Sequence, residues 1–321
     1  MTPAHFREHL DVLRRSRRVV PLGVMLASLR AGESLEGTVA VTFDDGYADV
    51  GREAAPALEE YEIPATAFVI TSAVGSEREF WWDELEQLVL HARDLPEILE
   101  LEIGGAIARW DFGAARPLDL HGALARLSLG LSTRRPFDLP RYRGWRVWIG
   151  EPPTSRHALY RDFWQRCQTL SIDERDHVLR QLRAAVGDGR GGARDSHRAM
   201  TVEELRSLAA SGLCDIGAHS ITHPKLASLS GAAQLEEIAG SKRWLETILD
   251  RPVTTFAYPF GGARDYTRET VELVRQAGYR GACANVPGAI IPDQDAYQLP
   301  RLFVHDWDGD EFARRLTEEH A

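Results

Sequence analysis

The sequence predicts an α/β fold built around parallel strands. Short apolar runs rich in β-forming residues recur along the 321 residues, and segments with the period of a helix lie between them. Successive strand, helix and strand units of this kind imply parallel strands that are joined by crossover helices. The repetition of these units predicts either a barrel or an open parallel sheet.

The first part of the chain contributes one such unit. Val39–Phe43 is an apolar run that ends at two carboxylates, and Ala65–Ile70, which follows Pro64, is a second strand rich in β-formers. The elements expected here, in order, are a helix over 4–15, an extended piece over 19–22, a helix over 24–30, a strand over 39–43, a helix over 50–60 and a strand over 65–70.

The middle of the chain interrupts this order. Residues 79–198 contain several helical stretches, one of which begins at a capping box formed by Ser171 and Glu174. No pattern of catalytic residues stands out in this region. We interpret residues 79–198 as a mostly helical insertion within a single domain that spans residues 1–321.

Helix and strand units return at Thr201, which forms a second capping box with Glu204. Gly212 and Gly278 follow helical stretches and are expected to end them. The elements expected in this part are helices over 201–212, 232–249 and 267–277, strands over 214–218, 254–258, 280–284 and 302–305, and a final helix.

Composition limits the classes of protein. The net charge of −10 argues against a nucleic-acid partner, because an excess of cations is needed to neutralise phosphates. The three cysteines are far apart and form no CxxC pair, which argues against a disulfide framework. No apolar run approaches the ~20 residues of a membrane span, and the N-terminus lacks a signal-peptide core. The default expectation is a cytoplasmic protein, with its oligomeric state left open.

Asp44 and Asp45 are the first candidates for chemistry. They directly follow a predicted buried strand, and the carboxyl ends of parallel strands are where α/β folds place their active sites. Two adjacent carboxylates repel each other, and burial desolvates them. A metal ion is the usual counter-charge for such a pair.

His219 and His223 follow the strand expected at 214–218. Two histidines at this spacing would lie on one side of a helical turn, where both imidazoles can bind one ion. Such a pair is more often solvated or structural than metal-binding, but its position at a strand end favours a ligand role. Two histidines and one carboxylate form the ligand set of a catalytic zinc site with a position open for water.

A third strand end lies at Tyr258-Pro259-Phe260-Gly261. The plain interpretation of this segment is a turn between a strand and a helix. The functional interpretation is that a backbone N–H near Tyr258 points at a developing oxyanion. Tyr258 and Pro259 are therefore candidates for contact with a substrate.

These three segments, TFDDG at 42–46, HSITH at 219–223 and FAYPFG at 256–261, resemble in this order the motifs of the polysaccharide deacetylases, carbohydrate esterase family 4 with the nodulation-deacetylase homology domain. The resemblance covers about 38–75 and 200–310. It implies a distorted (β/α) barrel of about seven parallel strands. It also implies removal of N-acetyl or O-acetyl groups from sugars with the help of one divalent metal.

The resemblance assigns roles by position. Asp44 would be the general base, and Asp45, His219 and His223 would hold the metal. Zinc is the favoured ion, with cobalt, nickel, iron and manganese as alternatives. The residues alone leave open an exchange of roles between the two aspartates.

Two positions depart from the family pattern. Many members carry an arginine in the third motif that steadies the base, where this chain has Ala257; Arg301 is the candidate replacement, and a surface arginine is the alternative. The general acid is commonly a histidine in a Leu-x-His context near the last strand, which His305 resembles. Relatives with an FAYPFG-type motif often take this histidine from an N-terminal strand-loop, whereas this chain opens with a predicted helix.

The sequence thus predicts a metal-dependent deacetylase that acts on an N-acetylated sugar or glycan intermediate. The absence of a signal peptide favours a nucleotide-linked, lipid-linked or small glycoside substrate over a mature wall polymer. Trp82 is a candidate for stacking on a sugar ring, although packing is the commoner role of such a residue. The alternatives are hydrolysis of another amide, such as a formamide or a cyclic amide, and a catalytically silent carbohydrate-binding protein.

Overall fold

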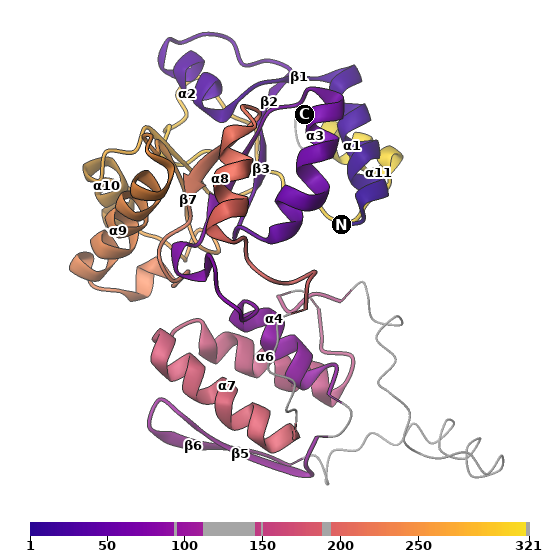
Figure 1. Ribbon diagram of the computed structural model, residues 1–321, viewed down its shortest axis with the longest axis vertical. Helices are drawn as coiled ribbons and strands as arrows, with labels where there is room; N and C mark the ends of the chain where they lie inside the picture. The colour runs from indigo at the N-terminus through magenta and orange to yellow at the C-terminus, as the bar shows by residue number, and fades with distance from the viewer. Residues whose placement is uncertain (93–94, 112–144, 149, 188–193, 319–321) are drawn as a thin grey trace, which may run out of the picture. The chain divides into compact units, whose positions relative to one another are not determined.

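A computed structural model describes residues 1–92, 95–111, 145–148, 150–187 and 194–318 (Figure 1). The chain forms two compact units. The first unit comprises Met1–Glu77 and Arg194–Ala321, and the second comprises Arg78–Ala193. Among the described residues, no helix has the length and apolar character needed to cross a membrane.

The described part of the first unit contains a sheet of five parallel strands in the order β3-β4-β7-β8-β9. From β4 onward, each strand pairs with the strand of this sheet that precedes it in the chain, so the sheet winds in one direction, as a barrel does. A separate parallel pair joins β1 (Arg18–Val19) to β2 (Thr38–Val39). The five strands are β3 (Val41–Phe43), β4 (Ala65–Val69), β7 (Cys214–Ala218), β8 (Thr255–Ala257) and β9 (Gly281–Cys283). The predicted α/β fold with parallel strands is confirmed, while closure into a barrel of seven strands stays a prediction.

Helices pack against these strands, and several begin at side chains that cap their first turn. Thr201 and Glu204 form the predicted capping box at the start of α8, and Ser230 Oγ accepts from the Ala233 N–H at the start of α9. The helical elements of the first unit are α1 (Pro3–Ser16), α2 (Leu22–Arg30), the π-helix η1 (Val50–Ala54), α3 (Ala55–Tyr61), the 3₁₀ turn η2 (Thr71–Ala73), α8 (Val202–Ala210), the 3₁₀ turn η4 (Leu226–Ser228), α9 (Gly231–Leu249), α10 (Arg268–Gln276) and α11 (Gly309–Glu318).

Both faces of the sheet are buried, which explains why every residue of β4 is buried. Ala67 and Val69 belong to the larger apolar core, which includes residues of α1, α8 and α9. Phe68, on the opposite face, packs in a second core with Leu26 of α2 and Cys283 of β9. Because the faces are closed by apolar side chains, the ends of the strands are the places left for polar chemistry.

Two predicted strands differ from those observed. The run at 39–43 is split at Ala40: β2 pairs with β1, and β3 pairs with β4. The strand expected over 302–305 is absent from the described residues. Instead, Leu299 makes a single parallel bridge to Cys283, and the following Pro300 has no N–H with which to continue a ladder.

The described part of the second unit combines helices with a β-hairpin. The helices are α4 (Trp81–Val89), α6 (Ser155–Cys167) and α7 (Ile172–Val186), and the antiparallel strands are β5 (Ile98–Ile103) and β6 (Ala106–Asp111). The hairpin was not predicted. Gly104 and Gly105 form its turn with φ angles of +59° and +78°, which suits a two-residue hairpin loop. Residues 112–144 lie outside the described residues, so a mostly helical character of 79–198 stays a prediction.

The stability of the second unit is expected to fall as the pH falls, because of His157. This side chain is 1% exposed, and burial lowers its pKa to about 4. Between pH 6.5 and 4 the unfolded chain takes up a proton that the folded chain does not, so acid favours unfolding by on the order of 1–3 kcal/mol. Denaturant unfolding measured from pH 7 to 4 checks this, with a flatter pH dependence expected in His157→Gln.

His177→Gln is the matched control for this experiment, because His177 lies on α7 of the same unit with its side chain 48% exposed. This variant is expected to keep the pH dependence of the parent. Parallel curves for the parent and His157→Gln would contradict the prediction.

Candidate metal centre

Asp45, His219 and His223 meet at the carboxyl ends of two strands of the sheet. Asp45 comes just after β3, and the histidine segment follows β7. The Asp45 Oδ1 atom lies 3.6 Å from His219 Nε2 and 3.7 Å from His223 Nε2. Both imidazoles are buried, and the ligand-type atoms of all three residues lie within 4.8 Å of one another. Atoms spaced in this way can bind one ion, since zinc binds nitrogen and oxygen at about 2.0–2.2 Å.

The backbones of neighbouring strands fix the orientation of His219. Its N–H donates to the Val69 carbonyl of β4 over 3.0 Å, and its Nδ1 lies 2.7 Å from the Ala257 carbonyl at the end of β8. A carbonyl only accepts, so Nδ1 carries the proton and the lone pair of Nε2 faces Asp45. Burial lowers the pKa of His219, which favours the neutral form that binds metals.

The loop that carries His223 is not the helical turn that the spacing predicted. Ser220 and His223 have φ angles of +65° and +55°, whereas helical residues have negative φ. The Ser220 Oγ accepts a hydrogen bond from the His223 N–H over 3.0 Å. Phe260 packs on the His223 ring, with 4.6 Å between ring centroids. The loop therefore brings the two imidazoles together by a tight reversal of the chain, with their centroids 4.8 Å apart.

Asp44 forms a bidentate ion pair with Arg301. The guanidinium donates from Nη1 to Oδ1 over 2.7 Å and from Nη2 to Oδ2 over 2.8 Å. The Arg301 side chain is 14% exposed and also donates to the Ala284 carbonyl, so it is not a surface arginine. Burial acts to raise the pKa of Asp44, but the charge and hydrogen bonds of Arg301, together with the nearby imidazoles, hold it at about 2. Asp44 is therefore ionised at neutral pH.

A model of the polysaccharide deacetylase family matches residues 31–93 and 191–282, which include both aspartates and both histidines of the site. Over these two segments the chain is similar to the polysaccharide deacetylase family. The family match ends before Arg301 and His305. YxkH of Bacillus subtilis (strain 168), a protein named as a polysaccharide deacetylase, is 31% identical over 105 residues, which are 33% of this chain and 36% of that protein. The match thus spans about a third of the length of this relative.

Two solved structures share the fold of this chain. The Streptococcus pyogenes deacetylase PplD, solved in complex with acetate, aligns with a TM-score of 0.54 at 14% identity over 99% of this chain and 87% of its own. IcaB from Ammonifex degensii aligns with a TM-score of 0.54 at 18% identity over 100% of this chain and 90% of its own. At such low identity the likeness shows the fold alone, a curled parallel sheet that forms a half-barrel.

The N–H of Tyr258 itself is bound within the protein, and an oxyanion donor near Tyr258 stays a prediction. Its N–H donates to the Cys283 carbonyl of β9 over 3.1 Å, and its hydroxyl donates to the Tyr297 carbonyl over 2.8 Å. Its ring is fully buried and stacks on Tyr266. This hydrogen bond extends the pairing of β8 with β9 by one residue, so the N–H of Tyr258 belongs to the sheet.

The third motif supports the metal-type ligands instead. The Ala257 carbonyl orients His219, and the Phe260 ring packs on His223. Phe260 and Gly261 have positive φ angles of +59° and +69°, and a Cβ on Gly261 would lie 2.7 Å from the Asn285 nitrogen. Glycine is therefore required at this turn. Pro259 is buried just before it, and a contact between Pro259 and a substrate stays a prediction.

His305 and Trp82 are the remaining predicted site residues. The His305 ring contacts those of Phe303 and Trp307, with centroid distances of 4.9 and 5.2 Å. Its role as general acid stays a prediction. Trp82 lies at the start of α4 in the second unit and stacks on Phe80 at 5.0 Å. Stacking of Trp82 on a sugar also stays a prediction.

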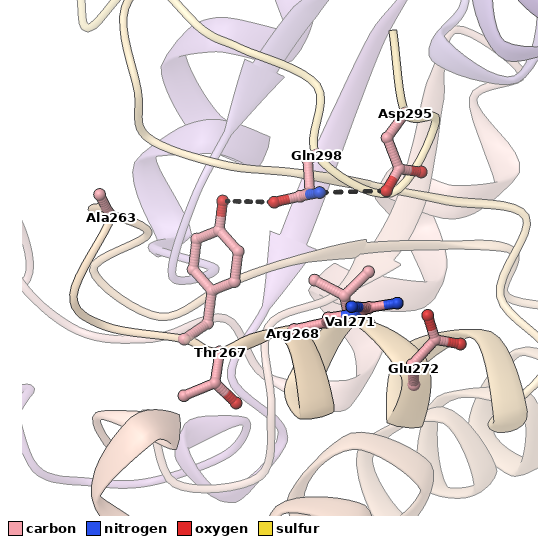
Figure 2. A pocket seen from close by; sticks show the side chains of 8 residues that line it. Ala263, Thr267, Arg268, Val271, Glu272, Asp295 and Gln298 are labelled. Atoms are coloured by element: carbon pink, nitrogen blue, oxygen red, sulfur yellow. Dashed lines mark hydrogen bonds between the residues drawn. The ribbon is translucent and has the colours of Figure 1, made fainter.

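A hollow of about 650 Å³ lies beside the start of α10 (Figure 2). The Tyr266 hydroxyl lies 3.5 Å from Gln298 Oε1, and Figure 2 shows the amide of Gln298 in turn bonded to Asp295, over 3.0 Å. The polar groups on this wall thus bond to one another. None of the predicted catalytic or metal-binding residues lines the hollow, whose residues are Ala263, Tyr266, Thr267, Arg268, Val271, Glu272, Asp295 and Gln298.

Several residues that shape the centre were not identified from the sequence. Gly46 has a φ of +88°, and a Cβ there would lie 3.1 Å from Val69 Cγ1, so glycine allows β3 to end close to β4. Asp45 itself has a φ of +71°, a conformation that is rare outside glycine and recurs at functional sites. The glycine directly after the two aspartates was the available signal for this turn. The role of the Ala257 carbonyl could not be predicted from the sequence, because every residue has a backbone carbonyl.

Proposed function

We propose that this protein is a metal-dependent hydrolase that removes an N-acetyl group from a sugar or a sugar-containing biosynthetic intermediate. One observation carries the proposal: a carboxylate and two imidazoles converge beside a second carboxylate, Asp44, that Arg301 keeps ionised. The match to the polysaccharide deacetylase family supports a carbohydrate substrate. The donor set favours zinc over cobalt, nickel, iron or manganese, because two nitrogens and one carboxylate oxygen form a common catalytic zinc site.

The position of each residue in the site indicates its proposed role. Asp45, His219 and His223 would hold the ion, which when bound supplies a Lewis acid that polarises a carbonyl and lowers the pKa of a water. Asp44 is ionised next to these ligands and takes the proton of the attacking water. Its low pKa makes it a weak base, so the acidity of the water matters as much as the base.

Arg301 holds the Asp44 carboxylate in one orientation through its two hydrogen bonds. Its proposed role is to position the base and keep it charged. The leaving amine must receive a proton as the C–N bond breaks. We assign this step to His305, and a His305→Ala variant that binds metal and keeps near-normal turnover would reject the assignment.

Metal analysis and product analysis on one preparation test the proposed function. We expect about one divalent ion per chain, because the three ligand residues form one group. We expect acetate release from a panel of nucleotide-linked, lipid-linked and small N-acetyl glycosides, lost with a chelator and restored by zinc. Release of formate in place of acetate would indicate a formamide substrate. A metal-free preparation that binds sugars unchanged would indicate a silent carbohydrate-binding protein.

A further inference from the structure

Glu237 of α9 bonds to the histidine loop, which we define as residues 219–223. Its Oε2 accepts from the Ile221 N–H over 2.8 Å and from the Thr222 N–H over 2.9 Å. Its Oε1 accepts from the Thr222 hydroxyl over 2.7 Å. One carboxylate thus makes three hydrogen bonds to two residues that lie between His219 and His223. Hydrogen bonds to a charged acceptor are stronger than those between neutral groups.

Other parts of the fold bind the carbonyl groups of the same loop. The Thr71 N–H donates to the Ser220 carbonyl over 3.3 Å, and the Ser72 N–H donates to the Ile221 carbonyl over 3.0 Å. Helix α9 also approaches the loop closely, because a Cβ on Gly240 would lie 2.6 Å from Ile221 Cδ1. Two carbonyls of the loop are therefore bound by backbone N–H groups, whereas two adjacent N–H groups of the loop bond to the side chain of one residue.

The loop needs such support because of its conformation. Ser220 and His223 have positive φ angles, which residues with a Cβ avoid unless the surrounding structure imposes them. The Ser220 hydroxyl bonds to the His223 N–H at one end of the reversal. Glu237 fixes the two residues in between. Without it, the backbone is free to relax and to carry the His223 imidazole away from Asp45.

We propose that Glu237 is a positioning residue for the metal centre, which holds the histidine loop in its ligand-binding conformation before an ion arrives. The inference rests on the proposed metal-dependent function. Glu237 acts through the backbone and does not itself bind the ion or the substrate. Loss of an outer partner of this kind typically weakens metal affinity by about 10–100-fold.

The test compares Glu237→Ala, Glu237→Gln and the control Glu236→Ala. Glu236 is the neighbouring residue of α9; its side chain is 67% exposed, and its carboxylate bonds to Arg243 and not to the histidine loop. Zinc affinity is measured by competition with a chelator. We expect the Kd to rise about 10–100-fold in Glu237→Ala, to rise less in Glu237→Gln, whose amide oxygen still accepts, and to stay within about twofold in the control. The visible spectrum of the cobalt-loaded protein should change in Glu237→Ala, change less in Glu237→Gln, and stay that of the parent in the control.

A zinc Kd within about threefold of the parent in both Glu237 variants, with an unchanged cobalt spectrum, would overturn the inference. If Glu237→Ala does not fold, Glu237→Gln decides through the same two readouts. Acetate release is not used, so the result is independent of the choice of sugar. Zinc bound equally by parent and variants defeats the inference alone, whereas a parent that binds no divalent ion defeats the proposed function and the inference with it.

Discussion

Substitution of Asp44 by asparagine is expected to lower kcat/KM for deacetylation by about 10²–10⁴-fold while the protein keeps its divalent ion. Asparagine has the size of aspartate but accepts no proton from water near neutral pH. Asp44 is not one of the three grouped ligand residues, and both of its oxygens accept hydrogen bonds from Arg301. Metal content and acetate release, measured on the same preparation, check the prediction.

Asp45→Asn is the matched comparison, because it makes the same change in the adjacent residue. The Asp45 Oδ1 atom faces both imidazoles at 3.6 and 3.7 Å. This variant is therefore expected to lose metal affinity first, and activity as a consequence, with partial recovery in excess zinc. The reverse pattern, in which Asp44→Asn loses the metal and Asp45→Asn keeps it, would indicate that Asp44 is the ligand and Asp45 the base. The residues alone left this assignment open.

The location of the site followed from the sequence because its residues come directly after short apolar strands. Phe43 ends β3 and Asp44 follows it; Ala218 ends β7 and His219 follows it. Parallel strands of one sheet have their carboxyl ends at the same edge, so two such junctions place their side chains close together. The order of strand and helix units was sufficient to predict that these residues lie close together. The resemblance to the family was needed to assign one aspartate as the base and the other as a metal ligand.

The local geometry of the site could not be predicted from the sequence, because it depends on residues that are distant in sequence. The spacing of His219 and His223 is that of a helix, yet hydrogen bonds to Glu237 of α9 stabilise a different conformation of the loop between them. Tyr258 lies at a turn in the sequence, but pairing with β9 decides that its N–H belongs to the sheet. In both cases tertiary contacts override what the local pattern favours.

The β5–β6 hairpin was not predicted, although the sequence pattern that indicates it is local. Leu99, Leu101 and Ile103 alternate with acidic residues, and Gly104 and Gly105 follow them at the turn. This is a standard hairpin pattern. The surrounding helical stretches favoured the interpretation of residues 79–198 as a mostly helical insertion.

Substitution of Arg301 by glutamine is expected to lower kcat/KM by about 10²-fold, because the base is then no longer held in position. The acid limb of the pH profile should also move to higher pH. Burial acts to raise the pKa of Asp44, and Arg301 is the main group that holds it at about 2. Without Arg301, burial prevails and Asp44 becomes protonated at a higher pH. Measurement of kcat/KM from pH 4 to 9 on protein of known metal content checks both effects.

The ion pair between Asp44 and Arg301 also stabilises the folded state, and this contribution decreases as the pH falls. A carboxyl group whose pKa is lower in the folded state stabilises that state above its ordinary pKa, and the contribution is lost as the pH falls toward the folded value. For Asp44 the loss is expected between about pH 4 and pH 2. Arg301→Gln should lack this contribution, so its stability relative to the parent should be lowest near neutral pH and recover in strong acid.

Arg301→Lys separates the charge from the geometry. Lysine keeps the positive charge but lacks the planar pair of donors that bonds both Asp44 oxygens. The acid limb should therefore stay nearer to that of the parent than in Arg301→Gln, while kcat/KM still falls. An equal shift of the acid limb in both variants would mean that the charge of residue 301 does not control Asp44.

The double variant decides whether Arg301 acts only through Asp44. If it does, Arg301→Gln should change kcat/KM by no more than about threefold in an Asp44→Asn background, because the base that it positions is already absent. A full further loss would indicate that Arg301 has a second role that does not involve Asp44. Activity of the single Arg301→Gln variant within a few-fold of the parent would remove Arg301 from the mechanism, despite its two short hydrogen bonds to Asp44.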